Sequence, residues 1–83
     1  MAAPAWSSLL YLKPSDFTNP NGLDASIVSA LDQFIGHIGS RPVILDDYRP
    51  GDPRQHGKGR AIDTTWPGQD PMRIWTEAFN WPA

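Results

Sequence analysis

The sequence predicts one small α+β domain, and three observations support that fold class. The chain has 83 residues, which is enough for a single core and too few for two. Apolar side chains recur at helical spacing in two stretches, whereas two shorter runs between them have the character of strands. The composition, 40% hydrophobic and 19% charged, is that of a globular chain rather than a disordered one.

Residues 1–22 are predicted to form an irregular N-terminal arm on a body made by residues 23–83. Prolines and the turn "NPNG" at 19–22 interrupt any long element in this arm. Apolar side chains are spaced along it that would anchor it to the body: Trp6, Leu9, Leu10, Leu12 and Phe17. Such an arm needs a packed surface to lie on.

The body is predicted to start with a helix over residues 24–38. Six large apolar side chains share one face of this helix: Ile27, Val28, Leu31, Phe34, Ile35 and Ile38. Asp24 is a suitable N-cap and Gly39 a suitable C-cap. A buried strand is expected at 42–46, followed by a loop over Asp47–Lys58 that is rich in proline and glycine.

A second strand is predicted at 60–64 and a second helix after Asp70. The alternation of a strand would place Ala61 and Asp63 on one face and Ile62 on the other. In the helix, Asp70 is the N-cap, Pro71 fits the first helical position, and an apolar stripe follows: Met72, Trp75, Ala78 and Phe79. Trp75 is expected in the core, while Trp81 has nothing in this sequence to cover it, so the fold is expected to continue past the last residue.

Charge and composition exclude several classes of partner. The net charge is −2 and the seven Lys and Arg are scattered, so there is no basic surface for nucleic acid. The N-terminus lacks the positive region of an export signal, and no apolar run is long enough to cross a bilayer, so no membrane partner is expected. Because the chain has no cysteine, any metal must be held by nitrogen and oxygen ligands.

His56 and Asp63 are the candidate metal ligands. Gly57 and Gly59 between them allow a tight reversal that folds an imidazole back toward a carboxylate, and Ala61 is too small to fill the gap. Two ligands make a partial site, and the plain alternative is a loop histidine hydrogen-bonded to a carboxylate. His37 is expected to stabilise the end of its helix, and Glu77 to be solvated surface.

The run "HGKGRAID" matches the pattern HxxGxAxD, which resembles the signature of the zinc D-alanyl-D-alanine carboxypeptidase and hedgehog-type metallopeptidase family. That family includes phage L-alanyl-D-glutamate endolysins. The flanking order is similar as well, from "LKPSDF" through a helix and an apolar strand to "DDYRPGDPRQH", so the resemblance covers roughly residues 12–80. It implies an antiparallel sheet, zinc held by His56 and Asp63, and a catalytic Arg49 that stabilises charge on the attacked carbonyl.

The chain departs from the family pattern at three points. Arg54 stands where the family has a serine, and Asp46 and Asp47 replace the small residues before Tyr-Arg. The family's last zinc histidine and its general base have no counterpart before Ala83. We therefore expect either the N-terminal part of a longer peptidase or a degenerate member of the family.

The resemblance implies a zinc-dependent peptidase that acts on peptidoglycan stem peptides, encoded by a phage as an endolysin or a virion-associated enzyme. Its expected location is the virion, or the host cytoplasm with release to the cell wall. The alternative is a non-catalytic virion or tail protein that keeps a degenerate peptidase fold and binds other virion proteins. A third possibility is a wall-binding module that stacks sugars on Trp66.

Overall fold

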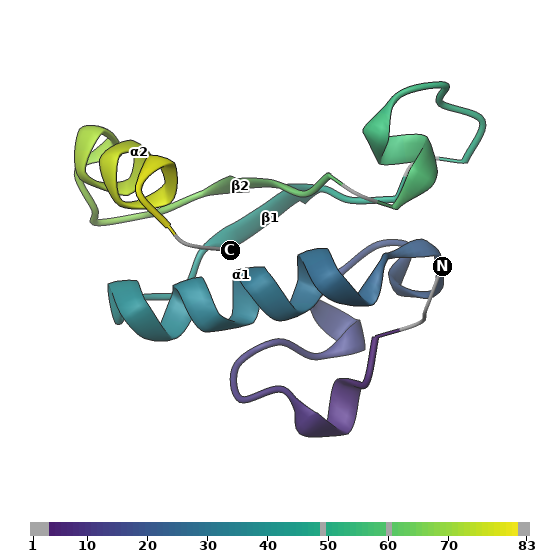
Figure 1. Ribbon diagram of the computed structural model, residues 1–83, viewed down its shortest axis with the longest axis horizontal. Coiled ribbons are helices and arrows are strands. Elements are labelled where there is room, and N and C mark those ends of the chain that lie inside the picture. The colour runs from purple at the N-terminus through teal and green to yellow at the C-terminus, as the bar shows by residue number, and fades with distance from the viewer. Residues whose placement is uncertain (1–3, 49, 60, 82–83) are drawn as a thin grey trace.

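The computed structural model describes residues 4–48, 50–59 and 61–81, and within these ranges it leaves out the side chains of Gln55 and His56. The described part is an α+β fold with a long helix α1 (Ala25–Ile38), a short helix α2 (Pro71–Phe79) and an antiparallel pair of strands, β1 (Val43–Asp46) and β2 (Asp63–Thr65). Figure 1 shows the strands lying along one side of α1, with α2 at one end of the molecule. The prediction of an α+β fold with two helices and a small antiparallel sheet is confirmed.

Helix α1 has the boundaries that its caps predict. The Asp24 side chain accepts a hydrogen bond from the Ser26 N–H, and Gly39 ends the helix in the left-handed conformation, with φ of 78°. A glycine is favoured there because a side chain is strained at positive φ. The buried face carries apolar side chains and one carboxylate: Val28, Asp32, Phe34, Ile35 and Ile38.

The two strands pair over a short distance and contain an irregularity. Val43 lies opposite Thr65 and Ile44 opposite Thr64, after which β1 shifts register before Asp46 pairs with Asp63. Ile44 packs on the core, whereas 64% of Leu45 is exposed on the other face, so the expectation of a fully buried strand at 42–46 is wrong. The second strand is Asp63–Thr65, and residue 60, where it was predicted to begin, lies outside the described residues.

The N-terminal arm is part of the core rather than an appendage to it. It contains three short 3-10 helices, Trp6–Ser8, Pro14–Asp16 and Pro20–Gly22. Leu12 and Phe17 are buried in the same cluster as Val28 and Ile35 of α1. Leu10 is 82% exposed and is not an anchor, contrary to the prediction.

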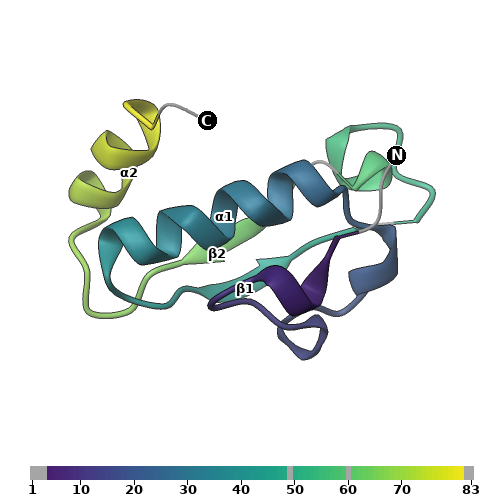
Figure 2. The ribbon, with the colours of Figure 1, turned by 60° about the horizontal axis from the view of Figure 1, so that its bottom comes forward.

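Two buried carboxylates hold the arm to the body. Asp32 of α1 accepts hydrogen bonds from the backbone N–H groups of Leu10, Tyr11 and Leu12, at 3.0, 2.9 and 2.9 Å. Asp47, just after β1, accepts two more, from Thr18 at 2.7 Å and Asn19 at 3.1 Å. Five backbone N–H groups of the arm are thus satisfied by two side chains, which compensates the cost of burying both charges. Figure 2 shows the arm running below α1 and β1 toward the start of α1.

Helix α2 packs with a different face from the one predicted. The side chains of its apolar stripe point outward: Met72, Trp75 and Phe79 are 65%, 62% and 75% exposed. Trp75 stacks on Phe79 instead of entering the core. Trp81, in contrast, is half-buried and meets the ring of Phe34 edge-on at 5.5 Å, so this chain does supply it with a partner. Within the described residues no helix has the length and apolar character to cross a membrane.

Candidate functional site

The segment that carries His56 is a short 3-10 helix, Gln55–Lys58, inside the stretch predicted to be loop. Both ribbon views place this segment at the opposite end of the molecule from α2 (Figures 1 and 2). The side chain of His56 lies outside the described residues, as does the whole of Arg49. The structure therefore defines the backbone around the candidate site and the position of Asp63.

Gly59, the glycine in the pattern HxxGxAxD, occupies a position that admits no other residue without distortion. Its φ is +69°, and a Cβ there would lie 1.9 Å from the carbonyl oxygen of Gly22. The Gly59 carbonyl accepts a hydrogen bond of 2.9 Å from the N–H of Asp24, the N-cap of α1. The chain thus turns sharply after the His56 segment, as the sequence predicts, and the turn is fixed against the start of α1.

Gly57 is required for a different reason. A Cβ at this position would lie 1.6 Å from the carbonyl oxygen of Asp52, so the two backbone segments touch. The Asp52 carboxylate in turn accepts a hydrogen bond of 2.7 Å from the N–H of Arg54. Arg54, at the family's serine position, is exposed on this loop. The loop before His56 is therefore folded on itself by local contacts.

Asp63 is exposed at the first position of β2. Ile62 beside it packs against the core cluster, which confirms the predicted alternation of these two residues. The register places Asp46 of β1 opposite Asp63, and Asp46 is half-buried with a carboxylate oxygen that accepts the N–H of Asp47 at 3.0 Å. Sequence reasoning did not bring Asp46 and Asp63 together, because only the register of the strands does so.

The donor groups suit zinc chemically, although the described side chains form only part of a site. Asp63 supplies oxygen, and His56 would supply nitrogen from the segment that precedes the Gly59 turn. Among the side chains that the structure describes, no three His, Asp or Glu gather closely enough to hold an ion. Asp63 is therefore an exposed carboxylate at the start of β2, and the imidazole of His56 lies outside the described side chains.

Tyr48, the residue before Arg49, lies against the last part of the arm. A Cβ at Gly22 would come within 2.0 Å of the Tyr48 ring, and the side-chain amide of Asn19 donates to the Tyr48 carbonyl at 3.0 Å. A pocket of about 220 Å³ lies here, lined by the Tyr48 ring and by residues Thr18, Asn19, Pro20, Asn21 and Gly22. The arm therefore contacts the backbone on both sides of the candidate site.

The other histidine has a structural partner far from this site. His37 Nε2 lies 2.7 Å from a carboxylate oxygen of Glu77, so α1 and α2 are linked by a polar contact. The pair is about two-fifths exposed and is expected to add little to stability. The contact corrects the expectation that Glu77 is only solvated surface.

Trp66 is engaged in packing. Its ring meets Phe34 edge-on at 5.5 Å, and its indole N–H donates to the Thr64 hydroxyl at 3.0 Å. A sugar-stacking platform needs an open ring face, and Trp66 is already half-buried against the core. On α2, the ring of Trp75 is exposed but is stacked on Phe79.

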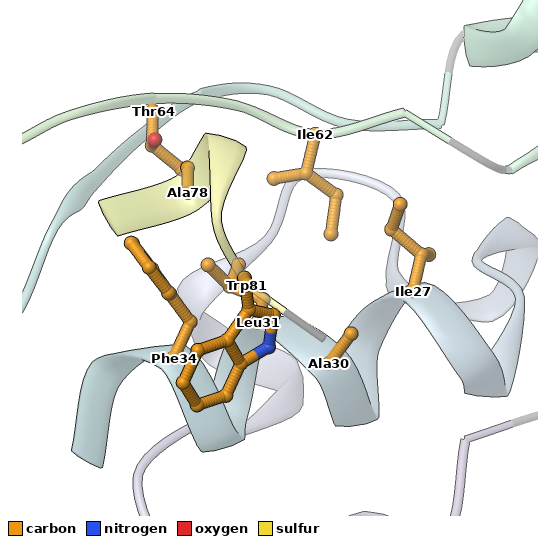
Figure 3. A pocket seen from close by; sticks show the side chains of 8 residues that line it. All are labelled: Ile27, Ala30, Leu31, Phe34, Ile62, Thr64, Ala78 and Trp81. Atoms are coloured by element: carbon orange, nitrogen blue, oxygen red, sulfur yellow. The ribbon is translucent and has the colours of Figure 1, made fainter. Parts of the chain in front are cut away.

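An apolar pocket of about 200 Å³ lies between α1, β2 and the C-terminal part of α2. Figure 3 shows Ile62, the residue before β2, pointing toward Ile27 of α1, with Trp81 lying across the region of Leu31 and Phe34. No charged side chain lines this pocket. It belongs to the packing of the helices rather than to the candidate site.

With this geometry established, the chain was compared with known proteins. No family model, no curated protein and no solved structure matches it. A functional conclusion must therefore rest on the residues and contacts themselves.

Sequence reasoning missed the two buried aspartates. Asp32 carried a readable signal, because it lies four residues after Val28 and three before Ile35 and so shares their buried helical face. An acid on an apolar stripe indicates a polar partner brought there by tertiary contacts. Asp47 gave no comparable signal, since its partners lie 28 and 29 residues away along the chain.

Proposed function

We propose that this chain is the zinc-binding part of a peptidase that cleaves peptidoglycan stem peptides. The observation that carries the proposal is the pattern HxxGxAxD, supported by the turn at Gly59 and by the exposed carboxylate of Asp63 on the next strand. The positive φ at Gly59 gives a turn between the two proposed ligands, and the proposed pairing of His56 with Asp63 requires a turn there.

In this proposal His56 and Asp63 hold the ion, and Arg49 lines the substrate cleft. Bound zinc would polarise the scissile carbonyl and lower the pKa of a water molecule. Arg49 would provide a fixed positive charge for the oxygen anion that develops on the attacked carbonyl. The proposed partner is the bacterial cell wall, reached by a phage protein from the virion or after release from the host cytoplasm.

The first prediction is that purified protein binds zinc and that His56→Ala abolishes binding. The measurement is elemental analysis after dialysis, followed by loss of turbidity of a cell-wall suspension. His37→Ala is the matched control, because His37 contacts Glu77 at the other end of the molecule. We expect the control to keep the zinc content of the wild type. Equal zinc content in wild type and His56→Ala would contradict the proposal.

A non-catalytic virion or tail module is the second candidate, and the surface of α2 favours it. Three large apolar side chains, Met72, Trp75 and Phe79, share an exposed face of this helix. Such a stripe is typical of surfaces that contact another protein. The two candidates differ in one measurement, since a structural module has no wall-lytic activity for His56→Ala to remove.

A further inference from the structure

The junction segment is defined as residues 18–24, the last part of the arm and the first two residues of the body. It contacts two stretches of chain that the sequence places far apart: Tyr48, next to Arg49, and Gly59, three residues after His56. Backbone atoms make the contact with Gly59, with the Gly22 carbonyl oxygen facing Gly59 and the Asp24 N–H donating to the Gly59 carbonyl at 2.9 Å, whereas Gly22 lies against the ring of Tyr48. The junction segment therefore determines how the two stretches sit relative to each other.

The junction segment is itself held by the Asp47 carboxylate. Asp47 is 2% exposed, and its two oxygens accept the N–H groups of Thr18 and Asn19 at 2.7 and 3.1 Å. The side chain of Asn19 then donates to the Tyr48 carbonyl at 3.0 Å, so the segment is joined to Asp47 and Tyr48, the two residues that directly follow β1. Charge-assisted bonds in a buried place are strong and directional, which makes this a rigid connection.

We propose that Asp47 is a positioning residue for the candidate metal site. It holds the junction segment, and the segment sets the turn at Gly59 and thereby the backbone that carries His56. The proposal rests on the proposed function for what the site binds, but the mechanical coupling can be measured without metal. Asp47 occupies a place where the family pattern has a small residue, so this chain would use its own means of fixing the loop.

The test compares Asp47→Asn with Asp32→Asn, in the full chain. Both variants weaken a buried carboxylate that holds the arm, but Asp32 binds Leu10, Tyr11 and Leu12, away from the junction. Hydrogen exchange of single amides is followed by NMR. The Asp24 N–H reports on the junction segment, and the Leu12 N–H reports on the contact of the arm with Asp32. We expect Asp47→Asn to speed exchange at Asp24 by about tenfold or more, and Asp32→Asn to speed it at Leu12 instead.

Zinc affinity is the second measurement. Loss of an outer residue that orients a ligand weakens metal binding by about 10- to 100-fold, so we expect this for Asp47→Asn and a change below about twofold for Asp32→Asn. If wild type binds no zinc, the proposed function fails, and the exchange result still decides whether Asp47 positions the loop. Equal exchange at Asp24 in the two variants would show that Asp47 is only a general stabiliser.

A milder variant keeps the proposal testable if Asp47→Asn does not fold. Asn19→Ala removes one hydrogen bond, to the Tyr48 carbonyl, from an exposed residue. We expect exchange at Asp24 to rise by about two- to tenfold, in line with the loss of one neutral hydrogen bond. An unchanged Asp24 amide in this variant would contradict the coupling between Tyr48, the junction segment and Gly59.

Discussion

Asp32 shows how a charge can be buried in a small core and still favour folding. Burial alone would raise the pKa of its carboxyl group, but the N–H groups of Leu10, Tyr11 and Leu12 and the charge of Arg41 together lower it below 3.8. The charged form is thus stabilised by folding, which links stability to pH. Arg41 contributes further by donating to the Tyr11 carbonyl and to Asp16.

The sign of this linkage gives a prediction. Because the pKa of Asp32 is lower in the folded state, its contribution is complete above the unfolded value of about 3.9 and is lost as the pH falls through the folded pKa. We expect Asp32→Asn to lower the free energy of unfolding by roughly 2–3 kcal/mol at pH 7, with a smaller loss at acidic pH. Urea unfolding from pH 7 down to about 3 measures the free energy of unfolding of the wild type and of Asp32→Asn. If the difference in free energy of unfolding between the wild type and Asp32→Asn did not change with pH, the prediction would be contradicted.

At the scale of elements, α2 has no fully buried side chain. Asp70 caps it by accepting the Met72 N–H, and Pro71 starts it, so its local signals are sound. Its contacts with the body come from Ile74 and Ala78, which face the pockets beside β2, and from the Glu77 contact with His37. A helix of nine residues is marginal alone and depends on such contacts.

Substitutions on the two faces of α2 should therefore differ in cost. We expect Met72→Gln, on the exposed face, to change the free energy of unfolding by less than about 0.5 kcal/mol. Ile74→Gln, on the half-buried face, should cost about 1–2 kcal/mol through lost apolar burial. Thermal unfolding followed by circular dichroism compares them. If Met72→Gln cost as much as Ile74→Gln, the outward face would have a partner in solution, and gel filtration at several concentrations would reveal a second copy.

At the scale of the whole molecule, the arm and α1 form one cooperative core. Leu12 and Phe17 are 3% and 7% exposed, as buried as the central residues of the helix. A domain of this size has little stability to spare, so the loss of one side of its core is severe. The arm and the body can be distinguished in the sequence, but in the structure their apolar side chains pack in the same core.

Removal of the arm tests this view. We expect a variant without residues 1–17 to lose cooperative unfolding, because Leu12 and Phe17 leave the core and Asp32 loses its partners. Deletion of residues 1–5 is the control and should keep a sharp transition, since Trp6 and its contact with Phe17 remain. Thermal denaturation measured by near-ultraviolet circular dichroism distinguishes the two. A sharp transition in the longer deletion would show that α1 and the sheet fold alone.

The parts of the fold that follow local rules could be predicted, and those that depend on distant contacts could not. Helix α1 was predictable because its caps and its spacing are all within residues 24–39. The face of α2 was not, since an amphipathic stripe does not reveal whether the protein or another molecule covers it. Of the candidate site, the turn at Gly59 and the opposite orientation of Ile62 and Asp63 were predictable. The contact of Gly22 with both Tyr48 and Gly59 was not, because it joins three segments that are distant in sequence.

The crowding around Gly59 also affects how its signature should be interpreted in any chain. Natural selection would keep a glycine here for the sake of folding alone, whether or not the protein performs chemistry, because a methyl group would collide with the neighbouring backbone. Conservation of this glycine among related sequences would therefore be weak evidence of enzymatic activity. Only the histidine and the aspartate distinguish an active descendant from a relic that has kept its shape.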